Sequence, residues 1–173
     1  MRGTILWFCI VFGVLILVFS LVLQTEFAQT RFINPHLAQV ALISGKVMNL
    51  LGAGCTVSGT IIASPRFSVE IIQGCESIYP TTLLWAALLA YPAGWKARLI
   101  GIVGGAVILF ILNIIRIMTM FAIGSFAPSL FDIVHLYAWQ AMFIILTLAV
   151  WLYWAAKIAP LFGGRKENPA TGR

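Results

Sequence analysis

The sequence predicts an all-α membrane protein with about four transmembrane helices, because its composition is strongly apolar and its apolar residues fall in four long runs. Of the 173 residues, 61% are hydrophobic and only 9% are charged, whereas soluble domains carry about 25% charged residues. A soluble fold of this length has no interior large enough to hide so much apolar surface, so the bilayer must cover part of it. The length suits one domain, and we expect a single integral membrane domain over residues 1–162.

The four apolar runs are the predicted spans, at about residues 5–23, 77–93, 99–123 and 133–158. Each has the length of roughly 17–25 residues that a helix needs to cross a bilayer. The first run is longer than the apolar core of a signal peptide, and no good cleavage site follows it. We therefore expect it to be retained as the first transmembrane helix.

The segment between the first two spans, residues 24–74, is the most polar part of the chain. Apolar residues recur at near-helical spacing over Pro35–Leu51, which indicates an amphipathic helix lying at the membrane interface. The stretches Val57–Ala63 and Phe67–Ile72 are separated by Ser64-Pro65-Arg66, and the second alternates apolar with polar residues. This pattern predicts a short β-hairpin that leads to Cys75 at the start of the next helix.

Charge indicates the orientation of the chain. The formal net charge is +6, and with four spans Lys96, Arg98, Lys157 and the basic residues of the polar tail, residues 163–173, fall on one side. The positive-inside rule makes that side cytoplasmic, so both termini are expected there and residues 24–74 outside. No array of basic and aromatic residues indicates nucleic-acid binding. An outward-facing segment of this kind predicts a bacterial inner membrane protein.

Helix lengths predict that Cys75, Arg116 and His135 lie at similar depth near the outer face. Counted from the basic residues that end the spans on the cytoplasmic side, Glu76, Arg116 and His135 are 20, 18 and 22 residues away. These counts correspond to roughly 30, 27 and 33 Å of helix. A thiol, a guanidinium and an imidazole are therefore expected in one layer, on three different helices.

Arg116 is the strongest single signal, because it is the only charged residue between Leu99 and Phe126. A charge inside a span costs at least about 2.5–3.5 kcal/mol, and such residues usually face the protein interior or a wet cavity. Asn113, one turn earlier on the same face, is a candidate supporting residue. The alternative is that Arg116 is an anchor that extends to the outer boundary.

Cys75 has three possible roles. At a helix N-terminus the positive end of the helix dipole favours a thiolate, and a nearby Arg116 would lower the thiol pKa further, as a nucleophile requires. Cys75 could instead be an inert small residue. It could also form a disulfide with Cys55, because both lie outside and only the predicted hairpin separates them.

His135 has two possible roles. Asp132 lies three residues earlier, where a carboxylate on the same helix face could orient the imidazole of a catalytic base. Alternatively, Asp132 caps the helix and His135 is an interfacial residue beside Tyr137 and Trp139.

Two further features concern packing and metals. Gly101 and Gly105 form a GxxxG pattern, which predicts close helix packing. The three cysteines and two histidines form no metal-binding motif, and we expect neither a metal nor another cofactor.

Three short motifs, taken together, resemble the exosortase/archaeosortase family and look most like its small exosortase H type. They are Gly74-Cys75, the stretch Asn113-Ile114-Ile115-Arg116-Ile117, and His135 followed by Trp139-Gln140. The resemblance covers the chain roughly from the predicted hairpin to the fourth span. Family members often have Asn or Ser directly after the cysteine and Gly at the next position, where this chain has Glu76 and Ser77.

The resemblance implies a membrane-embedded cysteine protease and transpeptidase that needs no cofactor. Its substrates are secreted, membrane-anchored proteins with a C-terminal motif, a transmembrane segment and a basic tail, which are cut at the outer membrane face through a thioester. Cys75 would be the nucleophile, Arg116 the positive group and His135 the proton-transfer residue.

The alternative function is a non-catalytic membrane assembly or transport component. Arg116 would then line a polar path or bind an anionic lipid headgroup, and Cys75 would pair with Cys55. A free Cys75 favours the enzyme, and a Cys55–Cys75 bond favours the alternative.

Overall fold

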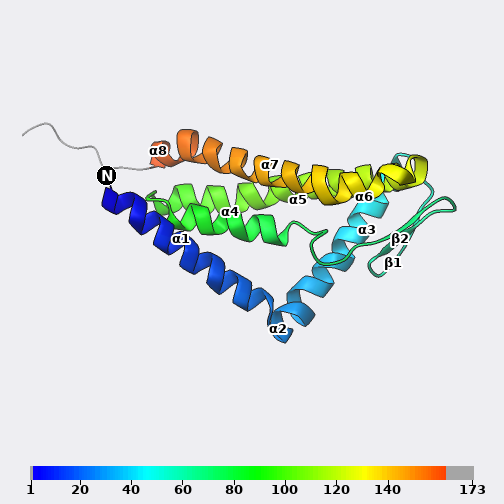
Figure 1. The fold of residues 1–173 in the computed structure, drawn as a ribbon, viewed down its shortest axis with the longest axis horizontal. Coiled ribbons are helices and arrows are strands. Elements are labelled where there is room, and N and C mark those ends of the chain that lie inside the picture. Colours follow the sequence, from blue (N-terminus) through cyan, green and yellow to red (C-terminus); the bar gives the residue numbers. More distant parts are fainter. Residues whose placement is uncertain (1, 163–173) are drawn as a thin grey trace, which may run out of the picture.

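Helices make up most of the chain, in agreement with its apolar composition. The computed structural model describes residues 2–162, and the predicted cytoplasmic tail, residues 163–173, lies outside the described residues. Three helical stretches are long and apolar enough to cross a bilayer, namely Thr4–Leu23, Trp95–Phe126 and Pro128–Phe162. The chain is therefore a mostly helical membrane protein, as predicted (Figure 1).

The first two stretches are formed by single helices, α1 (Arg2–Leu23) and α5 (Trp95–Phe126). The 32 residues of α5 reach roughly 48 Å, well beyond the hydrocarbon core of about 30 Å. The third stretch is a continuous run of helical segments: η2 (Pro128–Leu130), α6 (Phe131–Ile133), η3 (Val134–Ala138), α7 (Trp139–Tyr153), η4 (Trp154–Ile158) and α8 (Ala159–Phe162).

The predicted second span, residues 77–93, is a shorter helix, α4 (Ile78–Ala90). Its 13 residues rise about 20 Å, which is less than the hydrocarbon thickness of about 30 Å. The helix ends at Ala90 because Tyr91 precedes Pro92, and a residue before proline is driven out of the helical conformation. Tyr91 is accordingly extended, with ψ of 136°. The structure thus gives three candidate spans and one short apolar helix where four spans were predicted.

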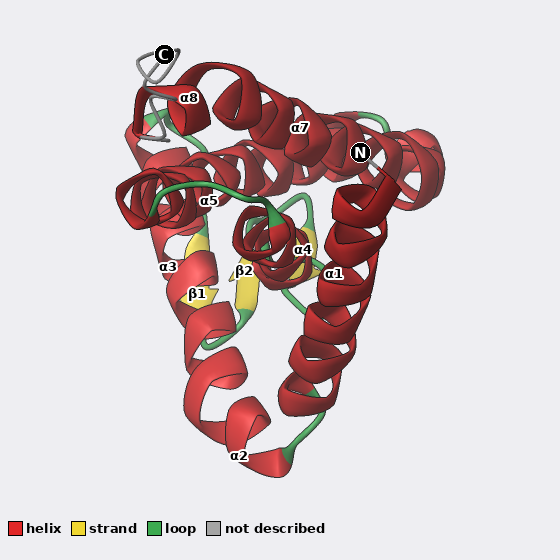
Figure 2. Ribbon diagram, turned by 90° about the vertical axis from the view of Figure 1, so that its left-hand side faces the viewer, coloured by secondary structure: helices red, strands yellow, loops and turns green. Residues whose placement is uncertain are grey.

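Between α1 and α4 the chain passes through α2 (Glu26–Ala28) and η1 (Gln29–Ile33) into α3 (Asn34–Leu50). α1 and α3 form the two arms of a V with α2 at its apex, and α4 lies between the arms (Figures 1 and 2). The amphipathic helix predicted over Pro35–Leu51 is confirmed as α3. Its buried residues recur at helical spacing: Leu37, Val40, Ala41, Ser44, Gly45 and Met48.

The β structure is a three-stranded antiparallel sheet in the order β1-β2-β3, and not a two-stranded hairpin. Val57–Ala63 was expected to be one strand, but it turns back on itself at Gly59, which has a positive φ of 61°. This conformation strains any residue with a side chain, so the glycine permits the tight turn. The strands are β1 (Thr56–Ser58), β2 (Ile61–Ala63) and β3 (Ser68–Glu70).

Two clusters of buried apolar side chains hold the elements together. One joins α3, the sheet and the C-terminal half of α5, and Cys75 packs against its edge. The other joins α4, α5 and the last helical run. The first cluster anchors the segment that follows the sheet, and the second fixes the helices around it.

The GxxxG glycines lie in the second cluster, where the predicted close packing is confirmed. A Cβ atom at Gly101 would come within 2.6 Å of Trp154 Nε1 and 2.8 Å of Leu88 Cδ2. Gly105 packs against Leu84. Trp154 Nε1 donates a hydrogen bond of 2.8 Å to Ala97 O, so the indole has little freedom to move away.

Gly101→Ala is therefore expected to lower the thermal stability of the detergent-solubilised protein. The added methyl group displaces Trp154 from its hydrogen bond with Ala97, and overpacking of this kind costs about 1–3 kcal/mol. The control is Gly104→Ala, because nothing lies within 4 Å of a Cβ at that position of the same helix. Equal melting temperatures for the two variants would contradict this account of the packing.

Candidate active site

The loop between β3 and α4 carries the candidate nucleophile. It turns tightly, since the backbone N–H of Cys75 donates a hydrogen bond of 3.0 Å to Ile72 O. Gly74 has a φ of 90°, a left-handed conformation that favours glycine over any residue with a side chain. The Gly74-Cys75 pair thus combines a turn that needs glycine with an adjacent thiol.

The structure brings His135 to Cys75 from the other end of the chain. Cys75 Sγ lies 3.4 Å from His135 Nε2, although 60 residues separate them in sequence. His135 is in η3, and its ring stacks on Phe131 with 5.6 Å between the ring centroids and 29° between the planes. The imidazole is therefore supported on one side by an aromatic ring and faces the thiol with a ring nitrogen.

Arg116 lies on the third side of the site, in α5. It is only 7% exposed, and its Nη1 donates a hydrogen bond of 3.2 Å to Gly74 O. Its guanidinium carbon lies 5.6 Å from the ring centroid of Phe143, a cation–π contact. A guanidinium has five N–H donors, so further donors remain for a ligand.

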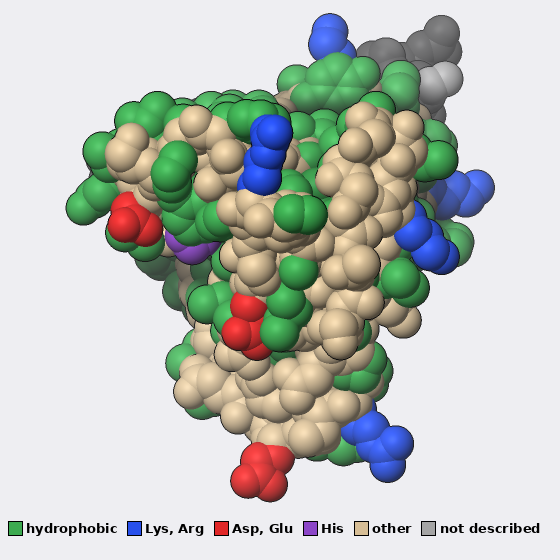
Figure 3. Space-filling view, turned by 90° about the vertical axis from the view of Figure 1, so that its right-hand side faces the viewer, with side chains coloured by type: hydrophobic (Ala, Val, Ile, Leu, Met, Phe, Trp, Pro, Cys, Tyr) green, Lys and Arg blue, Asp and Glu red, His purple; other side chains and the backbone are tan. Residues whose placement is uncertain are grey.

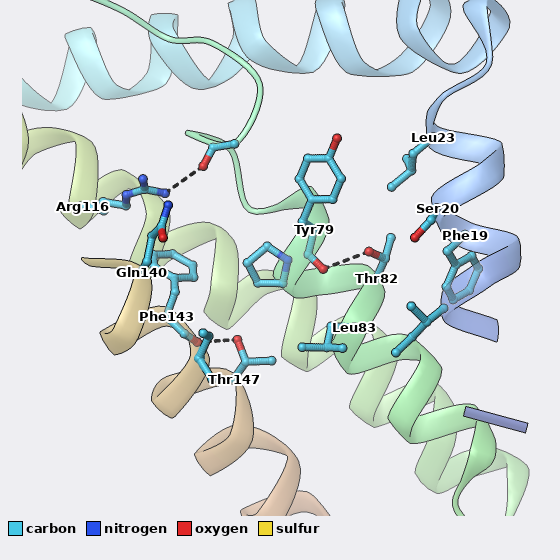
Figure 4. A pocket seen from close by; sticks show the side chains of 14 residues that line it. Phe19, Ser20, Leu23, Tyr79, Thr82, Leu83, Arg116, Gln140, Phe143 and Thr147 are labelled. Carbon is cyan, nitrogen blue, oxygen red and sulfur yellow. Dashed lines mark hydrogen bonds between the residues drawn. The ribbon is translucent and has the colours of Figure 1, made fainter. Parts of the chain in front are cut away.

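Two cavities meet at Arg116. The smaller, of about 30 Å³, is lined by Cys75, Arg116 and His135 together with apolar side chains. The larger, of about 390 Å³, is bounded by α1, α4 and α7 and reaches Gly74 and Arg116 (Figure 4). The three candidate residues thus line a small enclosed cavity, and Arg116 also borders the larger, mostly apolar one.

The end of the molecule near the sheet carries scattered charge. Figure 3 shows this face with basic and acidic side chains spread over it and a histidine visible between hydrophobic and acidic side chains. Residues 2–162 contain no cluster of three or more His, Cys, Asp or Glu side chains that could hold a metal ion.

The electrostatics of Cys75 differ from the expectation of a thiolate. Burial raises the pKa of the Cys75 thiol above its ordinary value, while the charge of Arg116 and the hydrogen bond with Ile72 oppose the shift and the charge of Glu76 adds to it. Burial is the largest of these effects. Moreover, α4 begins three residues later, at Ile78. The surroundings of Cys75 therefore favour the neutral thiol over the thiolate.

Glu76, which stands directly after the nucleophile, is 1% exposed. Neither of its carboxyl oxygens forms a hydrogen bond within the described chain. Burial raises the pKa of this carboxyl, and neighbouring backbone N–H groups and Arg116 oppose the rise. Glu76 therefore holds its proton more tightly than an exposed glutamate, which weakens its effect as an anion beside Cys75.

The two predicted supporting residues do not make the expected contacts. Asp132 is exposed and forms no hydrogen bond with His135, whose ring rests on Phe131 instead. Asn113 is fully buried, but neither atom of its amide group bonds to another residue of the described chain. Asn113 thus gives Arg116 no direct hydrogen bond.

Cys55 and Cys75 are both free, so the alternative disulfide is not formed. Cys55 is instead tied to the end of α3. Its thiol lies 3.2 Å from Asn49 Oδ1, its backbone N–H donates to the same oxygen at 2.7 Å, and Asn49 Nδ2 donates to Cys55 O at 2.7 Å. The free thiols favour the enzyme over the non-catalytic alternative.

Sequence reasoning assigned no role to several aromatic and polar residues around the site, although Gln140 belongs to one of the three motifs. Phe131 lies four residues before His135, a spacing that places both on one helix face. On α7, Gln140, Phe143 and Thr147 also share a face, which borders the larger cavity. The sequence did contain a signal for this face, because Gln140 and Thr147 are polar residues seven positions apart in an otherwise apolar helix.

A comparison with protein families indicates which family the chain belongs to. The family model described as Transmembrane exosortase matches residues 1–152 of the chain. The chain belongs to the transmembrane exosortase family. The match covers every element from α1 to most of α7, and with it Cys75, Arg116 and His135. Neither a curated protein nor a solved structure matches the chain, so the exosortase assignment rests on the family model and agrees with the three sequence motifs.

The raised thiol pKa predicts the pH dependence of Cys75 labelling. In a background where Cys9 and Cys55 are replaced by serine, the rate of alkylation by iodoacetamide should still rise between about pH 8 and about pH 9.5, beyond the midpoint of an ordinary thiol. Glu76→Gln should move the profile to lower pH, because it removes a negative charge, and Arg116→Gln should move it to higher pH. A rate that is already constant below about pH 8 would contradict the neutral resting thiol.

Proposed function

We propose that this exosortase is a membrane-embedded cysteine protease and transpeptidase that cleaves the C-terminal sorting signal of secreted proteins. The observation that supports this most directly is the 3.4 Å separation of Cys75 Sγ and His135 Nε2. Arg116, hydrogen-bonded to the same loop, adds a fixed positive charge. A thiol, a base within reach and a neighbouring cation are the groups that acyl transfer by cysteine requires.

In the first step Cys75 Sγ attacks the carbonyl carbon of the scissile peptide bond while its proton passes to His135 Nε2. Because burial favours the neutral thiol, the base acts during attack. The carbonyl oxygen becomes negative, and the free N–H groups of Arg116 stabilise it. The C–N bond then breaks, and His135 returns the proton to the leaving amine, which yields a thioester on Cys75.

In the second step an acceptor nucleophile attacks the thioester carbonyl. His135 removes the acceptor's proton, the new bond forms, and the Cys75 sulfur leaves and regains a proton. Water as the acceptor gives hydrolysis, and an amine or hydroxyl group gives transfer. Both outcomes pass through the same thioester and use the same three residues.

The proposed substrates are proteins whose C-terminal motif is followed by a transmembrane segment and a basic tail. A substrate anchored in the same bilayer reaches the site by diffusion in the membrane plane, which supplies proximity. With α4 counted as a crossing, the positive-inside rule places both termini in the cytoplasm of a bacterial cell and the Cys75 loop at the outer face.

Cys75→Ala should abolish processing of a secreted reporter that carries such a C-terminal signal, because no nucleophile remains. Cys55→Ala is the matched control, since this buried thiol lies outside both cavities, and it should cleave as the parent does. The shift in reporter size in membranes measures the reaction. Undiminished cleavage by Cys75→Ala would rule out this mechanism.

The other two residues give graded expectations in the same assay. Arg116→Gln should lower the cleavage rate about 10²- to 10³-fold, the usual effect of losing one oxyanion donor. His135→Ala should lower it about 10²- to 10⁴-fold, as for a lost general base. Asp132→Ala should have little effect, because Asp132 does not contact the imidazole.

A further inference from the structure

The larger cavity has the size and position of a binding site for part of the substrate. Its volume is about 390 Å³, within the range of about 300–1,000 Å³ that is usual for ligand pockets. Gly74 and Arg116 lie at one end, beside the Cys75 loop. From there it follows α7 to Thr147, 12 residues beyond His135 and so about 18 Å along the helix.

This direction indicates which part of the substrate the cavity receives. Two of the three helices that bound it, α1 and α7, belong to stretches that are long and apolar enough to cross a membrane. A cavity that starts at Gly74 and Arg116, beside the loop of the proposed nucleophile, and continues along these helices leads away from the scissile bond and toward the bilayer. It therefore suits the residues that follow the scissile bond and connect it to the substrate's transmembrane segment.

The polar groups of the cavity indicate the conformation of the bound segment. Thr82 and Thr147 are already occupied, because their hydroxyl groups donate to Tyr79 O at 2.9 Å and to Phe143 O at 2.7 Å. The hydroxyl groups of Ser20 and Tyr79 and the amide of Gln140 also line the cavity. Figure 4 shows Gln140 pointing toward Arg116 and Tyr79 standing on the α4 side, both without a dashed hydrogen bond from the side chain.

A helical segment would have no use for these free groups, because a helix satisfies its backbone N–H and C=O groups internally. An extended peptide in an apolar environment must find partners for its backbone, or it loses several kcal/mol for each unpaired group. Ser20, Tyr79 and Gln140 offer such partners from three different helices, between apolar walls formed by side chains such as Phe19, Leu83 and Phe143.

We propose that this cavity binds, in an extended and unwound form, the few apolar residues that follow the scissile bond of the substrate. Their side chains contact the walls of α1, α4 and α7, and their backbone pairs with Ser20, Tyr79 and Gln140. The inference rests on the proposed function and adds to it the conformation, chemical class and side of the segment that is recognised.

Cysteine cross-linking tests the conformation directly. In a variant with Cys9→Ser, Cys55→Ser and Cys75→Ala, the substrate is bound but not cut. A cysteine is introduced at Ile144, which lines the cavity, and single cysteines are scanned through the reporter residues after the scissile bond. Disulfides should form with every second position, because side chains of an extended chain alternate between two faces.

The matched control is Ile145→Cys on the same helix. Ile144 and Ile145 are 65% and 64% exposed, but Ile145 does not line the cavity, so it should give no periodic cross-links. Cross-links from Ile144 at every third or fourth position would show a helical segment and overturn the proposal. Absent cross-links at Ile144, or the same pattern from Ile145, would also overturn it.

Kinetics provides a second readout. Tyr79→Phe and Gln140→Leu should each raise KM about 3- to 10-fold, with a small change in kcat, as expected for one lost hydrogen bond. Thr119→Val is the control, because its hydroxyl group donates to Ile115 O of its own helix outside the cavity. An unchanged KM in both cavity variants would contradict the binding role.

The proposed function and the assignment of the cavity are tested by different results. If the parent enzyme does not cut the reporter, the proposed function is wrong and this inference is lost with it. If the parent cuts in a Cys75-dependent manner while the cross-links are helical or absent, only the assignment of the cavity is wrong.

Discussion

The hydrogen bond from Arg116 to Gly74 O is the contact on which the site depends, because it fixes a buried charge of α5 against the loop that carries Cys75. A guanidinium in an apolar helix is costly unless polar partners surround it. The loop carbonyl and the face of Phe143 supply part of this compensation. The sheet and α3 support the same loop from the other side, through the apolar cluster against which Cys75 packs. The polar segment between α1 and α4 therefore serves to position one thiol.

Burial of the site also affects the acid–base chemistry of Cys75. It raises the pKa of the Cys75 thiol despite the nearby Arg116, and so favours the neutral form of the candidate nucleophile. In the proposed mechanism His135 Nε2, which lies 3.4 Å from the sulfur, takes the proton as attack begins. The charge of Glu76, whose own pKa is raised by burial, is the smallest of the effects on the thiol pKa. A buried site of this kind thus avoids keeping a thiolate and an imidazolium apart in an apolar environment.

Spacing and composition predicted the features that follow from helix geometry, and missed those set by local backbone or by packing. Apolar periodicity located α1, α3, α5 and the last helical run, and counting residues along the helices predicted that Cys75, Arg116 and His135 lie at one level. The early end of α4 depends on Pro92, and the extra strand depends on a turn at Gly59. The support of His135 by Phe131 was not predicted, because Asp132, the nearest acidic residue, was taken as the partner of the imidazole. Burial, which decides the pKa of Cys75, is a property of the folded chain and has no local sequence signal.

The most direct test of the account is to trap the acyl-enzyme. Membranes that contain the parent enzyme and the reporter would be quenched in acid during turnover, and the enzyme analysed by peptide mass spectrometry. The account predicts that the peptide containing Cys75 carries the mass of the upstream reporter fragment and loses it on treatment with neutral hydroxylamine, which cleaves thioesters. Active cleavage with an adduct on another residue, or with no hydroxylamine-sensitive adduct on Cys75 under any quench time, would contradict the central claim that Cys75 is the acyl carrier.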